Sequence, residues 1–142
     1  MADYPDFANY KVPRFGSPKL LEASQWVASG ATIEIGSVVG VGTLFMAHCW
    51  ITNEIGGEAT KFYINLDGVG VYARAFQGMF DYGLWQYGNM FTYLSKYDLV
   101  EGDFGVVTGI GVTFEESVAV KYWHSLGHNV LAHIALQYAL LE

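Results

Sequence analysis

Apolar residues recur at every second position over much of this sequence, and that spacing is typical of a β-strand with one buried face. The clearest example is a hairpin, in which Phe62, Ile64 and Leu66 alternate with more polar residues. The turn signal Asp67-Gly68 follows, and the alternation resumes over 69–75. We therefore predict two antiparallel strands joined by a tight turn.

The same period of two runs over 31–41, 117–122 and 130–138. A turn at Leu126-Gly127 separates the last two segments, so we expect them to pair with each other. Glycine-spaced β pattern also covers 102–114. Together these segments predict an all-β fold, a compact antiparallel β-barrel or β-sandwich.

One short N-terminal helix precedes the strands in this prediction. Ser17 suits an N-cap and Gly30 suits a C-cap, and apolar residues lie between them at helical spacing, so we predict a helix over 18–28. Residues 1–16 form an irregular N-terminal arm, and 17–142 form a single β domain. The arm carries four aromatic residues that can dock on the body or on a neighbouring subunit: Tyr4, Phe7, Tyr10 and Phe15.

The composition limits how this fold can meet its surroundings. Of 142 residues, 52% are hydrophobic and only 15% are charged, which leaves too little charge to cover an isolated small domain. Residues 43–51 are apolar at nearly every position, which suggests a strand covered on both sides. We expect strands that are buried on both faces or an apolar surface that meets a partner, and we predict a homo-oligomer.

Charge and hydropathy exclude two classes of function. The chain is acidic, with a net charge of −7, and has no basic stripe, so we predict no binding to nucleic acid. No apolar stretch is long enough for a transmembrane helix. The first residues lack the pattern of a signal peptide, so cytoplasmic residence is the default expectation, and secretion stays open if a leader was removed.

No nucleotide-binding, nucleophile or zinc motif is present, and we predict no catalytic residue, no cofactor and no metal. His124 and His128 flank a turn where they could face each other as metal ligands, but without acidic neighbours we expect ordinary surface histidines. His48 is expected to be a core histidine with a backbone partner. Cys49 is expected to be a buried, unreactive thiol.

The segment 80–97 is the candidate binding surface, because aromatic rings close to glycines can line a cleft for carbohydrate or a flat apolar molecule. The alternative is that these rings close one end of a barrel or form a subunit interface. Arg74 is the only arginine after residue 14 and could hold an anionic group, although a pairing with Asp67 or Glu34 is favoured. The predicted ligand-binding residues are Tyr82, Trp85, Tyr87, Phe91, Tyr93 and Arg74.

The leading hypothesis is therefore a non-catalytic protein that binds a ligand or partner through an aromatic-rich surface. A second hypothesis is an enzyme of the small-barrel isomerase or cyclase type, in which His48, Arg74 and Glu34 would share a hydrophobic lumen. A third is a membrane-active or self-assembling structural protein. The direction of those three side chains separates the enzyme from the binding protein.

The glycine-spaced segment 38–45 resembles 106–114, which suggests an internal repeat of two related strand motifs. The run Gly42-Thr43-Leu44-Phe45, with Phe62-x-Ile64 and Gly70-x-Tyr72 after it, resembles the small virulence-associated (Vap) proteins of actinobacterial pathogens. The resemblance implies a secreted eight-stranded β-barrel without catalytic residues and with a role directed at a host or a membrane. The chain departs from that family by lacking a leader and by the helix predicted before the barrel.

Overall fold

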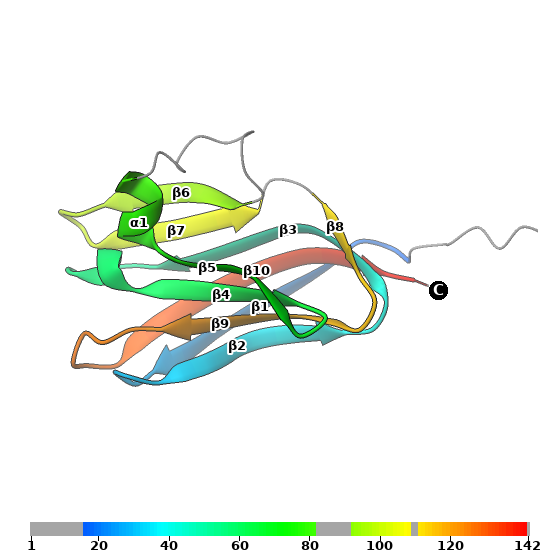
Figure 1. The fold of residues 1–142 in the computed structure, drawn as a ribbon, viewed down its shortest axis with the longest axis horizontal. Coiled ribbons are helices and arrows are strands. Elements are labelled where there is room, and N and C mark those ends of the chain that lie inside the picture. The colour runs from blue at the N-terminus through cyan, green and yellow to red at the C-terminus, as the bar shows by residue number, and fades with distance from the viewer. Residues whose placement is uncertain (1–15, 82–91, 109–110, 142) are drawn as a thin grey trace, which may run out of the picture.

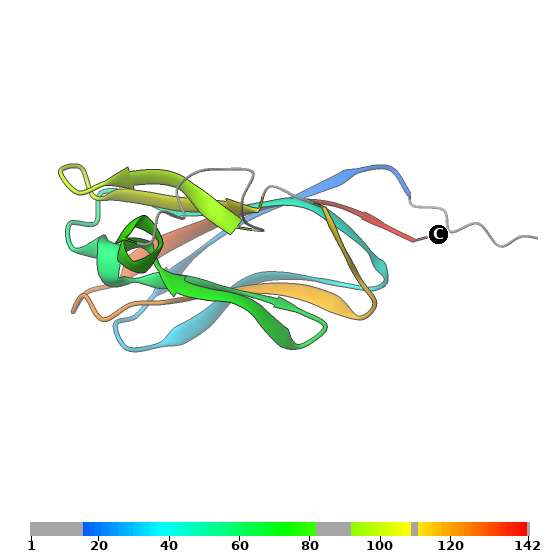
Figure 2. The ribbon, with the colours of Figure 1, turned by 45° about the horizontal axis from the view of Figure 1, so that its top comes forward.

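The computed structural model describes residues 16–81, 92–108 and 111–141. It is an all-β fold in which two antiparallel sheets pack face to face as a sandwich (Figures 1 and 2). The prediction of a compact antiparallel all-β protein is confirmed, and of the two architectures offered by the sequence the sandwich is the one formed.

The larger sheet has six strands, and β3 lies at its centre. In spatial order the sheet contains β1 (Lys19–Val27), β10 (Val130–Leu140), β3 (Gly42–Ile51), β7 (Asp103–Thr108) and β6 (Thr92–Asp98), with β8 (Val112–Phe114) also paired to β3. All of these pairings are antiparallel.

The smaller sheet has four strands and covers the inner face of the larger one. Its spatial order is β2 (Thr32–Val39), β9 (Ser117–Trp123), β4 (Lys61–Leu66) and β5 (Val69–Ala75). The β4–β5 hairpin is the one predicted from the sequence. Asp67 and Gly68 both take positive φ values, 53° and 77°, which is the geometry of a type I′ turn and suits the twist of the two strands.

The predicted helix over 18–28 is wrong, because Lys19–Val27 forms β1. Nine residues of this segment pair in continuous register with β10, from Lys19 opposite Tyr138 to Val27 opposite Val130. The local helix signals are overridden by these backbone hydrogen bonds, which a distant strand supplies.

The expected pairing of the strands at 117–122 and 130–138 is also wrong. Both segments are strands, but β9 lies between β2 and β4 in the smaller sheet, whereas β10 lies between β1 and β3 in the larger one. The turn after Trp123 therefore crosses from one sheet to the other (Figure 1). A turn signal indicates a reversal of the chain and does not indicate which sheet receives the next strand.

Two short helical segments connect strands along the chain. The 3-10 helix η2 (Gly57–Ala59) lies between β3 and β4, and helix α1 (Phe76–Asp81) lies between β5 and β6. Helix α1 follows β5 and lies against β6 and η2 at one end of the sandwich (Figure 2). Within the described part of the chain, no helix is long and apolar enough to cross a membrane.

An aromatic cluster joins the two sheets through α1. The fully buried Phe76 ring lies 6.1 Å from Phe62 of β4, centroid to centroid, and 5.5 Å from Phe104 of β7. Phe104 in turn contacts Tyr97 of β6, whose ring stacks on Phe80 at 4.4 Å. The start of the aromatic segment therefore serves to close one end of the core.

Asp67 also fixes the far end of the β4–β5 hairpin. Its carboxylate accepts hydrogen bonds from the backbone N–H groups of Glu115, Glu116 and Ser117 at 2.7–3.1 Å. These three donors stabilise the charged form and lower the pKa of Asp67 below its ordinary value. The segment between β8 and β9 is thereby held against the hairpin.

Replacing Phe76 with alanine is expected to destabilise the protein by about 3–5 kcal/mol, because the substitution leaves a cavity between the two sheets. Urea unfolding followed by circular dichroism measures the loss. Phe80→Ala is the matched control: Phe80 is 47% exposed, so the expected loss is about 1 kcal/mol. Equal losses for the two variants would contradict the role assigned to Phe76.

Candidate functional site

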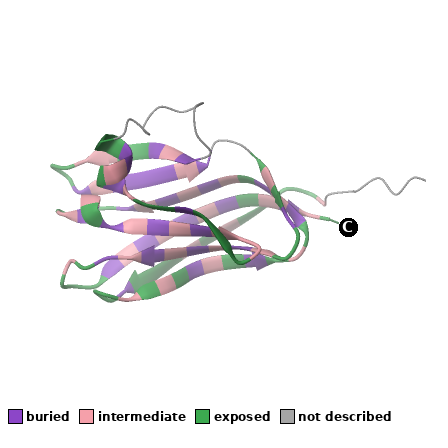
Figure 3. Ribbon diagram, viewed as in Figure 1, coloured by how far each residue is buried: buried purple, intermediate pink, exposed green. Residues whose placement is uncertain are grey.

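The strand predicted to be covered on both sides, β3, is fully buried on one side only among residues 16–81, 92–108 and 111–141. Its inner residues Leu44, Ala47, Cys49 and Ile51 are fully buried against the smaller sheet. Its outward residues are only partly buried or exposed, and they too are mostly apolar: Phe45, Met46, His48 and Trp50. Figure 3 shows this alternation of buried and partly exposed residues along the strands. We call the outward side of β1, β10, β3, β7 and β6 the outer face.

Three stacked rings occupy the middle of the outer face. The ring of Trp50 on β3 stacks on His48, at 4.6 Å between ring centroids, and on His133 of β10, at 5.3 Å. The ring planes are inclined by only 28° and 16°, so both imidazoles stack on the indole. We call these three residues the His–Trp–His stack.

A serine holds each end of the stack. Ser24 Oγ of β1 and His133 Nδ1 lie 2.7 Å apart in a hydrogen bond. Ser95 Oγ of β6 and His48 Nε2 lie 3.1 Å apart in a second one. The stack and its two serines thus connect the two edges of the larger sheet. His48 was expected to be a core histidine with a backbone partner, and both parts of that expectation are wrong, because the side chain faces outward and its partner is a serine.

Gly105 of β7 makes room beside the stack. A Cβ at this position would lie 2.5 Å from Ser95 Oγ and 3.3 Å from Trp50 Cβ, so no larger residue fits without displacement. Next to it is an open hollow of about 200 Å³. The hollow is lined by His48, Trp50, Ile51, Thr52, Ser95, Lys96, Asp103 and Phe104. A second open hollow of about 500 Å³ lies on the same face around Leu20 and Phe45.

Burial against the stack affects the ionisation of both histidines. Desolvation lowers the pKa of His48 and of His133 below 6.5, so both imidazoles are neutral at pH 7. The three central strands of the outer face consequently carry no charged side chain at neutral pH. This holds for the outward positions from 131 to 137 on β10, from 46 to 50 on β3, and at 105 and 107 on β7. The charged side chains Glu22 and Lys96 lie on the edge strands β1 and β6.

The structure places few of the predicted ligand-binding residues together. Tyr82, Trp85, Tyr87 and Phe91 lie outside the described residues, so their role stays a prediction. Tyr93 of β6 pairs with Val107 and belongs to the outer face. Arg74 is exposed on β5 of the smaller sheet, and no carboxylate of the described residues pairs with it. The expected partner Asp67 instead accepts the three backbone N–H groups described above.

The three residues of the enzyme hypothesis do not share a cavity. His48 lies on the outer face of the larger sheet, whereas Glu34 of β2 is exposed on the outside of the smaller sheet, next to the buried Ile35. Arg74 is exposed on the edge strand β5. The arrangement that this alternative needs is therefore not formed by these side chains.

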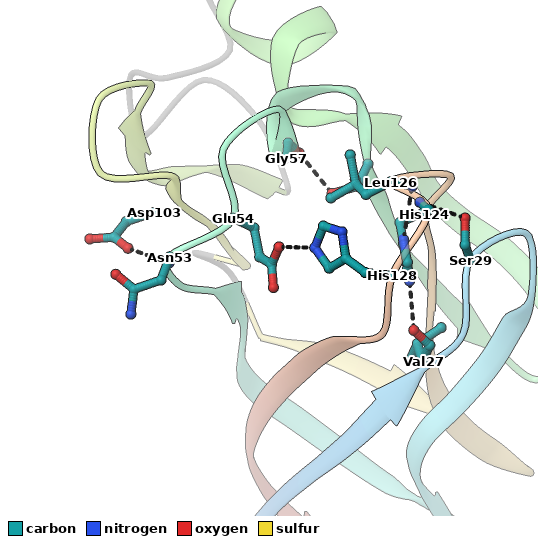
Figure 4. Close-up of polar contacts among 11 residues, drawn as sticks. Val27, Ser29, Asn53, Glu54, Gly57, Asp103, His124, Leu126 and His128 are labelled. Atoms are coloured by element: carbon teal, nitrogen blue, oxygen red, sulfur yellow. Dashed lines mark hydrogen bonds and ion pairs between the residues drawn. The ribbon is translucent and has the colours of Figure 1, made fainter.

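The two histidines that flank the turn after β9 have separate structural roles (Figure 4). His124 is fully buried: its Nε2–H donates to the Val27 carbonyl at 2.6 Å, and its Nδ1 accepts from the Leu126 N–H at 3.2 Å. The expectation of a surface histidine is wrong for His124, because the chain crosses between the sheets there and carries the ring into the core.

His128 is exposed, as expected, and donates from Nε2 to Glu54 Oε2 at 2.6 Å (Figure 4). The carboxylate raises the pKa of His128 above 6.5. Both ring nitrogens of His124 are occupied by backbone groups, so the two imidazoles cannot bind one metal ion. No cluster of three or more metal-ligating side chains occurs among the residues described by the structure.

Sequence reasoning missed Trp26, Trp50 and His133. The signal for Trp50 was present, because residues 43–51 are apolar at both parities. The sequence does not show that the smaller sheet covers only one of the two faces of this strand. Cys49 lies on the face that the smaller sheet covers, and the prediction that it is buried is confirmed. Burial raises the pKa of its thiol, which supports the prediction that it is unreactive.

Comparisons with family models and with curated proteins find no match. Among solved structures, the fold is similar to a chain of the "Cyanophage Pam1 capsid asymmetric unit", with 11% sequence identity and a TM-score of 0.49 over 99% of both chains. At this level of similarity the comparison supports no statement about function.

The opposite pKa shifts of the histidines can be tested by NMR titration of the imidazole protons. His48 and His133 are expected to titrate below pH 6.5 and His128 above it. Glu54→Gln should move the His128 pKa back toward 6.5 and leave the other two unchanged. Titration of His48 at pH 6.5 or above would contradict the desolvation of its ring in the stack.

The same shifts set opposite trends in stability with pH. Because the folded state favours neutral His48 and His133, their contribution to the free energy of unfolding is complete above pH 6.5 and is lost as the pH falls through their folded-state pKa values. The contribution of His128 is complete below pH 6.5 and is lost as the pH rises through its raised pKa.

Proposed function

We propose that this chain is a non-catalytic binding protein and that its contact surface for a protein partner is the outer face. The observation that carries the proposal is that β3 is apolar on both sides, while the residues that the structure describes bury only one of them. Covering apolar surface is worth about 2.5 kcal/mol for each 100 Å² removed from water, before the costs of association are subtracted.

The distribution of charge supports the same proposal. Protein interfaces have a centre depleted of charged residues and enriched in aromatic residues and methionine, and a polar rim. The outer face has Trp50, Met46 and two neutral histidines at its centre, while Glu22 and Lys96 lie on its edge strands. Trp26 and Leu20, which are 65% and 56% exposed, add apolar surface along β1.

A protein partner fits the stack better than a carbohydrate does. Sugars bind to tryptophan by stacking on an open face of the indole, and Trp50 is partly buried and already stacks on two imidazoles. The hydroxyls of Ser24 and Ser95 are engaged with those imidazoles. The carbohydrate hypothesis for Tyr82, Trp85, Tyr87 and Phe91 is a separate prediction, which a glycan array with Trp85→Ala and Tyr87→Ala would test.

The proposal can be tested with anilinonaphthalene sulfonate, an anionic dye whose aromatic rings fluoresce when they bind uncovered apolar surface. At low protein concentration the wild-type chain is expected to bind the dye. Val107→Glu introduces a charge next to His48 on the outer face and should abolish most of the fluorescence.

The control is the same substitution on the other sheet. Val39 of β2 is 78% exposed, so Val39→Glu should leave dye binding unchanged. Circular dichroism would verify that both variants are folded. Dye binding that is absent from the wild type, or equal in all three proteins, would contradict the assignment of the outer face as the contact surface.

A further inference from the structure

We propose that the partner is a second copy of this chain, and that the two outer faces pack against each other about a two-fold axis parallel to the strands and centred on β3. This inference rests on the proposed function, because it requires the outer face to be the contact surface. It adds the identity of the partner and the geometry of the contact.

The strand order makes the outer face suited to such an arrangement. In the row β1-β10-β3-β7-β6, β3 is the middle strand. A two-fold axis along β3 places β1 of one copy over β6 of the other, and β10 over β7. Sheets that pack face to face keep their strand directions within about 30°, which this axis satisfies. Every contact then occurs twice, as in isologous dimers.

Shape complementarity is provided by Trp26 and the hollow beside the stack. Trp26 projects from β1 and is 65% exposed. Trp26 pairs with Leu131 of β10, which is two residues from His133. Because His133 pairs with Trp50 of β3, Leu131 is level with Thr52, two residues beyond Trp50. The hollow of about 200 Å³ at that level lies between β3 and β6. The axis therefore brings Trp26 of each copy to the hollow of the other, where a buried tryptophan is a typical binding hot spot.

Charge complementarity follows from the same axis. Glu22 of β1 lies opposite Ala135 of β10. Ala135 is two residues from His133, which pairs with Trp50. Lys96 lies on β6 opposite Gly105, which is itself opposite Trp50. When β1 of one copy faces β6 of the other, the carboxylate and the ammonium lie within one or two residues of each other at the rim. Two such pairs form in each dimer.

The size of the outer face meets the requirement for a specific dimer. Five strands at a spacing of about 4.8 Å span about 24 Å, and a strand of about eight residues spans about 26 Å. Each copy thus contributes about 600 Å², and the pair buries about 1,200 Å², which lies at the lower end of specific interfaces. The centre of this area is the charge-free region around the stack.

Sedimentation equilibrium of the full chain over a range of concentrations tests the proposal. The wild type is expected to form a dimer. Trp26→Ala should raise the dissociation constant about tenfold or more, because it removes an aromatic anchor from each half of the interface. Val39→Glu, on the outside of the smaller sheet, should leave the constant unchanged.

A charge reversal provides a second test that leaves the core untouched. Glu22→Lys and Lys96→Glu should each raise the dissociation constant by about fivefold, since each creates two like-charge contacts at the rim. The double variant should return the constant to within about twofold of the wild-type value. This recovery is not expected of a dimer that uses another surface.

The outcomes separate the two proposals. A chain that binds the dye but stays monomeric overturns the dimer and leaves the outer face as a surface for a different protein. A dimer that is unaffected by Trp26→Ala and by both charge reversals overturns this inference. A monomer that does not bind the dye has no uncovered apolar surface on its outer face and overturns both proposals.

Discussion

The mutual burial of the inner faces of the two sheets is the contact on which the other features of this protein depend. Side chains on a strand alternate between two faces, so placing Ala47, Cys49 and Ile51 in the core directs His48 and Trp50 outward. The His–Trp–His stack is therefore a consequence of the core register rather than an independent element. The aromatic contacts through Phe76 hold the sheets in that register, because they join β4 to β7 across the gap between them.

Irregularities in the strands adjust which residues reach the outer face. The register between β3 and β10 shifts between Gln137 and Tyr138, so that Phe45 of β3 is the extra residue of a bulge. Phe45 is consequently 42% exposed, whereas Leu44 and Ala47 are both buried. A similar shift in β2, around Ile35, leaves Val39 at 78% exposure although strict alternation would place it with the buried residues. Both bulges therefore add apolar surface to the outside of the sandwich.

Local sequence signals predicted the elements whose structure is decided by neighbouring residues. The β4–β5 hairpin follows from alternation and from Asp67-Gly68, whose backbone conformation few other pairs adopt. The segment 18–28 has equally clear helical signals, but its structure is decided by β10, more than a hundred residues away. The same limit applies to the candidate site: Tyr93 was predicted from its aromatic neighbourhood, and its role stays a prediction. Trp26, Trp50 and His133 come from three strands whose adjacency no local pattern reveals.

The sequence by itself determined the fold class, the tight hairpin and the buried Cys49, and it determined that an apolar surface had to meet either a second layer or a partner. Only the tertiary structure decided which surface that is. Alternation assigns residues to two faces without saying which face a second sheet covers, and the covering strands β9 and β4 come from distant parts of the chain. Since β9 and β10 were divided between the sheets, the smaller sheet buries one side of β3, and the side with the His–Trp–His stack is left uncovered by the strands that the structure describes.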